Sequence, residues 1–248
     1  MSTTTANKQN RTMNKKTLIT LACICGVGAL GLGGVLLAPL LHEPTINEAC
    51  AAARISTEDD TVRQYLENGG DVNARNHEGE TILMSACMFD QATAASIALL
   101  NNADINLTDN EGNTALHIAA QFGSPRCVER LLLEKPAELR NNSGFTPLIS
   151  ACAFPIINQR DTHDEFGSSR SACIIKLLQA GSNVNATDNS GMTALHYAAW
   201  YGNLAAIQFL LDGAADTTLR DKNGQTAADI AAERGFQNCV IKLRSANR

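Results

Sequence analysis

Two stretches that share one pattern determine the fold. Residues 112–132 read GNTALHIAAQFGSPRCVERLL, and residues 191–211 read GMTALHYAAWYGNLAAIQFLL. In both, a threonine two positions after a glycine precedes a short alanine-rich segment, and a second segment with apolar residues at helical spacing follows. Each stretch therefore predicts a pair of short helices joined by a tight turn.

The pattern recurs along most of the chain. The threonine stands at Thr81, Thr114, Thr146, Thr193 and Thr226, with spacings of 33, 32, 47 and 33 residues. Polar turns such as Asp104-Ile105-Asn106 close the units. One unit cannot bury its apolar helix faces alone, so successive units are expected to stack about 10 Å apart around a continuous core.

On these residues the chain resembles ankyrin-repeat proteins, whose Thr-Pro-Leu-His signature stands here as TALH at 114–117 and 193–196. The resemblance implies an all-α solenoid of helix-turn-helix units with β-turn tips. It also implies a concave face, made by the first helices and the turn tips, where partners bind. Six units are expected within residues 45–248, at about 46–79, 80–112, 113–144, 145–191, 192–224 and 225–248.

The two end units depart from the pattern. The first lacks the threonine, and the last carries Ala228 and Asp229 at the leucine and histidine positions. Terminal repeats expose one face to water, so both are interpreted as capping units.

The N-terminal region predicts a membrane anchor. Residues 17–41 hold no charged side chain, and Lys8, Arg11, Lys15 and Lys16 precede them. About 20 apolar residues cross a hydrocarbon core. We therefore expect a basic tail at 1–16 and a transmembrane signal anchor at 17–41. Because the basic flank stays inside, the N-terminus should be cytoplasmic and the repeats exoplasmic, which is periplasmic in a bacterium.

A cleaved signal peptide is the alternative interpretation. Val27 and Ala29 would occupy the small-residue positions before the cut, and the repeats would be released as a secreted effector or inhibitor. Cleavage there would leave an exposed apolar tail at 30–41, so the uncleaved anchor is preferred.

Charge argues against nucleic acid as a partner. All 25 acidic residues, but only 16 of the 20 basic ones, follow position 41. Neutralising phosphates requires clustered lysine and arginine. The repeats are therefore not expected to bind nucleic acid through a basic face.

Aromatic residues recur at one position of the repeat. Phe89, Phe122, Phe154 and Tyr201 each follow the small pair of a first helix by two residues, with Trp200 beside the last. Aromatic side chains dominate protein-binding hot spots. We expect these five residues, here called the aromatic stripe, to contact a protein partner; the alternative is that half-buried rings merely close the groove.

Two further contact residues are expected at the turn tips. The resemblance implies that tip residues project towards ligands, and Phe145 and Met192 are the apolar side chains among them. They complete the predicted partner-binding set.

The fourth unit is longer than the others, with an insertion at 155–169. Asp161, His163, Asp164 and Glu165 are too close in sequence to fix a cation geometry, and no second histidine or cysteine cluster joins them. The segment is interpreted as a recognition loop or a neutral insertion.

No arrangement in the sequence predicts catalysis. His117 and His196 directly follow Thr-x-Leu, and the resemblance implies that they make hydrogen bonds between repeats. No nucleophile, base and oxyanion hole occur together. We expect a protein that is not an enzyme and takes no metal, cofactor or small-molecule substrate.

The cysteines of the repeats are predicted to be free thiols of the core, whereas Cys23 and Cys25 fall in the expected membrane segment. Cys127, Cys173 and Cys239 share one position of the second helix, while Cys87 and Cys152 share one position of the first helix in units two apart. Equivalent atoms in neighbouring units lie about 10 Å apart, whereas a disulfide requires Cα atoms within about 7 Å.

Overall fold

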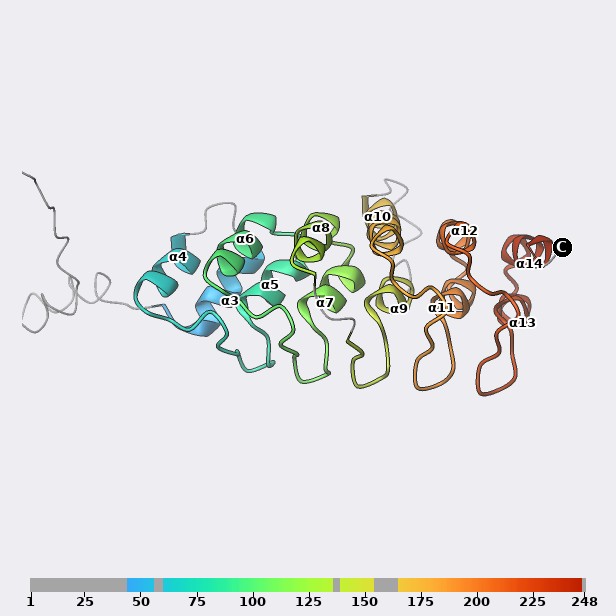
Figure 1. Cartoon of the computed structure of the whole chain (residues 1–248), viewed down its shortest axis with the longest axis horizontal. Coiled ribbons are helices and arrows are strands. Elements are labelled where there is room, and N and C mark those ends of the chain that lie inside the picture. Colours follow the sequence, from blue (N-terminus) through green and yellow to red (C-terminus); the bar gives the residue numbers. More distant parts are fainter. Residues whose placement is uncertain (1–43, 56–59, 136–138, 154–164, 247–248) are drawn as a thin grey trace, which may run out of the picture. The chain divides into compact units, whose positions relative to one another are not determined.

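A computed structural model describes residues 44–55, 60–135, 139–153 and 165–246, which form two rows of helices with a row of loops along one side (Figure 1). The inner row comprises α3 (Ile46–Ile55), α5 (Ile82–Met88), α7 (Ala115–Phe122), α9 (Pro147–Cys152), α11 (Ala194–Trp200) and α13 (Ala227–Glu233). The outer row comprises α4 (Asp60–Glu67), α6 (Ala92–Leu100), α8 (Pro125–Leu133), α10 (Glu165–Gln179), α12 (Leu204–Asp212) and α14 (Gln237–Ser245).

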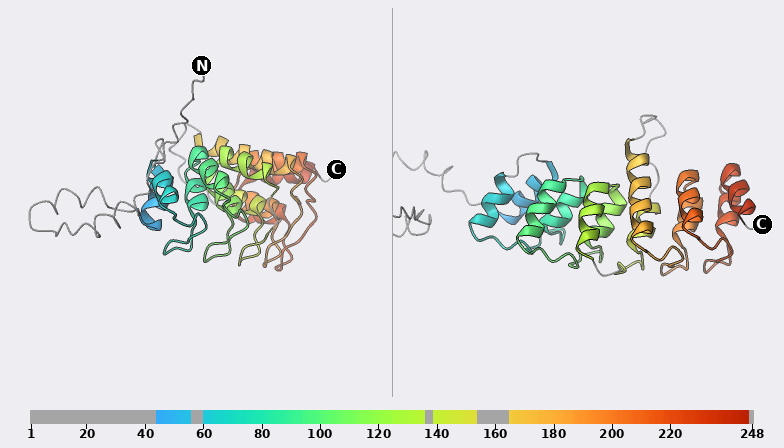
Figure 2. Two further views of the ribbon diagram at one scale, coloured as in Figure 1. Left: turned by 60° about the vertical axis from the view of Figure 1, so that its left-hand side comes forward. Right: turned by 45° about the horizontal axis from the view of Figure 1, so that its top comes forward.

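The predicted all-helical solenoid is confirmed for these residues. Each inner helix contacts the inner helix of the next pair, and the outer helices from α6 onwards do the same. The two views of Figure 2 show the pairs following one another in chain order. Within the described ranges the β-structure consists of one isolated bridge, between Thr187 and Thr193.

Threonine caps explain where the inner helices begin. The Thr114 side chain accepts a hydrogen bond from the His117 backbone N–H, and the Thr114 N–H donates to His117 Nδ1 over 3.2 Å. This reciprocal capping satisfies two backbone donors that the first turn leaves free. Thr193 and His196 repeat the arrangement in α11. The repeated threonine therefore sets the register of the inner row.

The same histidines connect consecutive repeats. His117 Nε2 lies 2.9 Å from the Phe145 carbonyl oxygen, and His196 Nε2 lies 3.2 Å from that of Gln225. Because a carbonyl oxygen only accepts, Nε2 carries the proton and Nδ1 is left to accept. Burial lowers the pKa of both imidazoles, which favours this neutral form. The structural role implied by the resemblance is confirmed.

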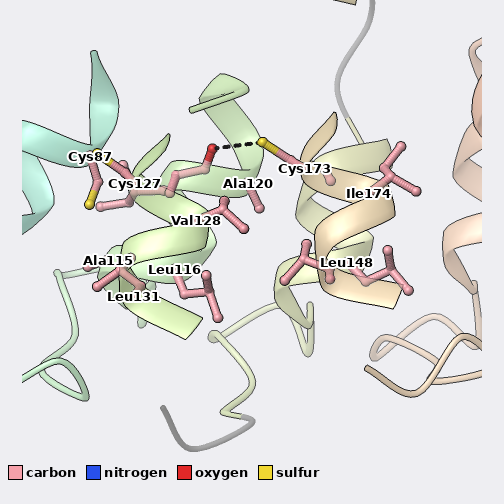
Figure 3. Close-up of a cluster of buried hydrophobic side chains, with 14 of the residues drawn as sticks. Cys87, Ala115, Leu116, Ala120, Cys127, Val128, Leu131, Leu148, Cys173 and Ile174 are labelled. Carbon is pink, nitrogen blue, oxygen red and sulfur yellow. Dashed lines mark hydrogen bonds between the residues drawn. The ribbon is translucent and has the colours of Figure 1, made fainter. Parts of the chain in front are cut away.

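The core runs continuously between the two rows. Small side chains such as Ala119 and Ala120 are fully buried and let inner helices approach closely, while Leu131 of α8 fills the space behind them. Figure 3 shows this cluster where the second, third and fourth repeats meet. The six cysteines in the described residues are buried free thiols, as predicted.

The loops, here called fingers, are joined by a ladder of backbone hydrogen bonds. The N–H groups of Asn142, Asn189 and Lys222 donate to the carbonyls of Glu111, Ser143 and Ser190 in the preceding finger, at 3.0 to 3.1 Å. The glycines of neighbouring fingers face these contacts, so a Cβ on Gly112 would lie 2.6 Å from Asn142 Oδ1. The ladder requires glycine there both for its positive φ and for space.

Both predicted N-terminal segments fall in a part of the chain that the structure does not describe. The basic tail at 1–16 and the anchor at 17–41 lie outside the described residues. Among the residues that are described, no helix is both long and apolar enough for a membrane span.

The insertion at 155–169 is described only from residue 165, where α10 begins. Its last five residues are thus helical rather than part of a loop. The extra residues make α10 15 residues long, against 9 for α8 and α12.

Candidate functional site

The described members of the aromatic stripe occupy the C-terminal ends of inner helices. Phe89 caps α5, Phe122 is the last residue of α7, and Trp200 and Tyr201 end and cap α11. Phe154 lies outside the described residues. The recurrence of one helix end in successive repeats explains why residues far apart in sequence fall on one edge of the inner row.

Phe89 and Phe122 share a cavity. It has a volume of about 430 Å³, and its other lining residues are Met88, Asp90, Gly123, Ser124 and Ser169. Phe89 is 54% exposed and Phe122 is 38% exposed, although both residues are large and apolar. Exposed aromatic rings beside a cavity provide a surface on which an apolar side chain of a partner can be buried.

The extension of α10 forms one wall of this region. Ser169 lines the cavity, and Arg170 packs so closely that a Cβ on Gly123 would lie 2.9 Å from Arg170 Cγ. Burial lowers the pKa of the Arg170 guanidinium. The inserted residues therefore alter the surface beside Phe122, whereas the rest of the solenoid keeps its register.

An ion pair holds Asp90, another residue that lines the cavity. Arg126 Nε lies 2.9 Å from Asp90 Oδ2, and Asp90 Oδ1 accepts hydrogen bonds from the backbone N–H groups of Arg126 and Cys127. Asp90 thus fixes the turn after Phe89 against the start of α8. The ring of Phe89 is presented from an anchored turn, which limits the entropy lost on binding.

Trp200 belongs to a second cluster in the last two repeats. The Arg234 guanidinium carbon lies 4.1 Å from the Trp200 ring centroid, in the geometry of a cation–π contact. The Phe236 ring closes over Gly202, whose added Cβ would lie 2.6 Å from that ring. Phe236 also lines a cavity of about 360 Å³ with Leu204. The aromatic stripe is therefore divided into a Phe89–Phe122 part and a Trp200 part.

Sequence reasoning missed Arg234 and Phe236. Arg234 stands two residues after the small pair Ala231-Ala232, which is the same register that selected Phe122. Inspecting the same repeat position in the last unit, whatever residue type stands there, would have identified Arg234. Phe236 follows the next glycine and had no equivalent aromatic in other repeats to mark it.

The predicted tip residues lie at the bases of the fingers. Phe145 is half-buried and meets the Tyr197 ring edge-on, with centroids 5.3 Å apart. Tyr197 in turn donates its hydroxyl to Asp188 Oδ2 over 2.7 Å. Burial and this bond raise the pKa of Tyr197. Met192 is half-buried, and its N–H donates to the same Asp188 side chain.

The N-terminal end of the inner row, around α3, carries charged side chains. Arg54 of α3 binds Glu78 over 2.9 Å and also pairs with Glu80. The bond from Arg54 lowers the pKa of Glu78. Throughout the part of the chain that the structure describes, no group of three or more histidine, cysteine or acidic residues is placed to hold a metal ion.

Comparison with sequence families gives consistent matches across the repeats. A family model described as ankyrin repeats in three copies matches residues 49–140 and 96–162. A second, described as ankyrin repeats in many copies, matches residues 177–231. Together they cover both halves of the solenoid.

Curated relatives match over part of their length. The chain is 51% identical over 72 residues to an ankyrin repeat and LEM domain-containing protein 1 homolog of Caenorhabditis elegans, covering 29% of this chain and 10% of that protein. It is 37% identical over 82 residues to human ankyrin repeat domain-containing protein 37, covering 33% of this chain and 52% of that protein. The chain thus spans about a tenth and about half of these two relatives.

A solved structure matches most of the chain. It is a chain of the complex of the Bd0816 predatory endopeptidase from Bdellovibrio bacteriovorus with immunity protein Bd3460. The TM-score is 0.64 at 26% sequence identity, and the match covers 79% of this chain and 96% of that chain.

Proposed function

Because the chain belongs to the ankyrin-repeat family, we propose that it is a non-enzymatic module that binds a partner protein through the exposed edge of its inner helices. The observation that carries this proposal is the exposure of Phe89 and Phe122 around one cavity. Leaving two aromatic rings in water costs free energy that burial against a partner would recover. Trp200, Tyr201, Phe145 and Met192 extend the proposed contact surface.

Alanine substitution of the aromatic stripe tests this proposal. A partner captured by crosslinking to the wild-type chain should bind the variant F89A/F122A/W200A/Y201A at least about tenfold more weakly, because hot-spot aromatics contribute more than about 1 kcal/mol each. Titration calorimetry or surface plasmon resonance measures the affinity.

The matched control removes apolar area elsewhere. Leu100 and Leu133 are 79% and 70% exposed and end the outer helices α6 and α8. The variant L100A/L133A should keep the wild-type affinity. If both variants fold with the wild-type circular dichroism and bind equally well, the stripe is not the contact surface.

A second candidate is inhibition of an enzyme. It draws on the likeness to a chain of a complex that contains an endopeptidase and an immunity protein. Under this second proposal, the partner of this chain is a peptidase whose activity falls on stoichiometric addition of the repeats. An assay of the captured partner on a peptide substrate decides between simple binding and inhibition.

We also propose that residues 17–41 tether the module to a membrane, with the repeats on the exoplasmic side. The uncharged run and its basic flank support this topology. A tether raises the effective concentration of the repeats near membrane partners. The alternative is a secreted module.

Two measurements decide the location. Mass spectrometry of the mature N-terminus should find residues 17–41 intact, whereas cleavage within them would establish secretion. The second measurement uses a reporter enzyme that is active only outside the cytoplasm. Fused after the last residue, it should be active, because the repeats are proposed to be exoplasmic.

A further inference from the structure

Outer helices place one residue against the inner helix of the preceding repeat. The Cys127 sulfur of α8 lies 3.9 Å from the Ala86 carbonyl oxygen of α5, and the Cys173 sulfur of α10 lies 4.0 Å from that of Ala119 in α7. Ala86 and Ala119 are both the first residue of the small pair in their inner helices. The contact is therefore a property of the repeat register.

The second residue of the small pair differs between the two interfaces. Ala120 follows Ala119, but Cys87 follows Ala86. At the interface of the second and third repeats, a thiol thus stands on both sides, and both are fully buried. Figure 3 shows Cys87 and Cys127 beside each other in the core. A hydrogen-bonding contact with Cys127, together with burial, raises the pKa of the Cys87 thiol well above its ordinary value.

The register separates this pair from the other cysteines. Cys152 stands at the position of Cys87, but the residue at the position of Cys127 in the following repeat is Ala206. Cys239 stands at the position of Cys127, but the preceding repeat offers Ala199. Among the described repeats, cysteine occupies both halves of the contact at one interface. A comparison of equivalent repeat positions does not reveal this pair, because Cys87 and Cys127 stand at two different positions of the repeat.

We propose that Cys87 and Cys127 form a redox site, whose oxidation to a disulfide links the second and third repeats covalently. With a small-molecule disulfide as oxidant, one thiolate attacks it and releases a thiolate, giving a mixed disulfide. The second cysteine then attacks the protein sulfur and releases the other half. The two protein thiols lose two protons and two electrons, and the oxidant is reduced to two thiols.

Burial determines when this bond forms. The thiolate is the reacting species, and the raised pKa of Cys87 disfavours it in the closed interface. Oxidation is therefore slow in the folded protein and fast while the repeats assemble or when their interface opens. The bond would join residues 40 positions apart and so restrict the unfolded chain.

Peptide mapping of the full-length chain in detergent tests the proposal. One sample is incubated folded with oxidised glutathione, and a second is unfolded in urea and refolded with the same reagent, so that access does not limit the result. Free thiols are then blocked with N-ethylmaleimide and the digest is analysed without reduction. We expect a Cys87–Cys127 linked peptide pair, predominant in the refolded sample, and a melting midpoint several degrees above that of the reduced protein.

Substitutions test whether the linkage depends on the repeat positions that Cys87 and Cys127 occupy. Cys87→Ala and Cys127→Ala should abolish the linked pair and the shift of the midpoint, whereas Cys173→Ala should keep both. Ala120→Cys should add a second linkage, to Cys173. The proposal is overturned if Cys87 and Cys127 are still free thiols after refolding and are therefore alkylated. It is also overturned if they link preferentially to other cysteines, or if the linked protein melts at a lower temperature than the reduced protein.

Discussion

His117 and His196 show at the scale of single residues how one side chain serves two repeats. Each ring accepts from its own N-cap threonine and donates to a carbonyl of the following repeat. A protonated ring could not accept at Nδ1, so the arrangement requires the neutral form. The resemblance to ankyrin repeats implied the bonds between repeats, and the structure adds that the Thr-x-x-His spacing serves as a capping box.

Acid should weaken the fold through these residues. Burial lowers both histidine pKa values below the ordinary value of 6.5, so the unfolded chain binds more protons as the pH falls past that value. The histidine contribution to stability is present above about pH 6.5 and is lost as the pH falls through the folded-state pKa values. Thermal melts between pH 8 and pH 5 should show a falling midpoint.

The control replaces both rings by a residue that cannot titrate. H117Q/H196Q retains an N3 acceptor for the cap but no imidazole. It should melt lower than the wild type at pH 8 and show a smaller pH dependence. An unchanged slope would mean that other groups cause the acid sensitivity.

The finger glycines give a second prediction at this scale. Gly112→Ala combines a φ of 81° with a Cβ placed 2.6 Å from Asn142 Oδ1, whereas Gly224→Ala has a similar φ of 79° and no atom within 4 Å. We expect Gly224→Ala to cost about 1 kcal/mol of unfolding free energy for its backbone strain alone, and Gly112→Ala to cost about 2 to 4 kcal/mol. Urea denaturation measures both, and equal losses would exclude a role for the finger contact.

At the scale of elements, the apolar period predicted the helices well where repeats are regular, because threonine caps mark each start. It failed at α10. A spacing of 47 residues reveals added chain but not whether that chain extends a helix or forms a loop. Packing of Arg170 against Gly123 places the extension beside the cavity, and neither residue signals this contact in the sequence.

Helix α8 provides an element-scale test of the two-row arrangement. Leu131 is 1% exposed and faces the core, while Leu133, two positions later, is 70% exposed. Leu131→Ala should destabilise the protein by about 2 to 5 kcal/mol because it leaves a cavity, and Leu133→Ala by less than about 0.5 kcal/mol. Chemical denaturation of the two variants compares them directly. Similar losses would contradict the assignment of α8 to a half-buried outer row.

At the scale of the whole molecule, stacking converts sequence period into a surface. Phe89 and Phe122 lie 33 residues apart and share a cavity because their helices end at the same level. The register predicted that recurrence. It could not predict that Arg234 would lie over the Trp200 ring or that Phe236 would pack on Gly202, because these contacts join different repeat positions.

Hydrogen–deuterium exchange of the full chain with and without its captured partner tests the central claim most directly. The account predicts slower exchange in peptides that cover the ends of α5, α7 and α11, around Phe89, Phe122 and Trp200, with α6 and α12 unchanged. Protection confined to the outer helices, with the ends of the inner helices exchanging as in the free protein, would contradict it.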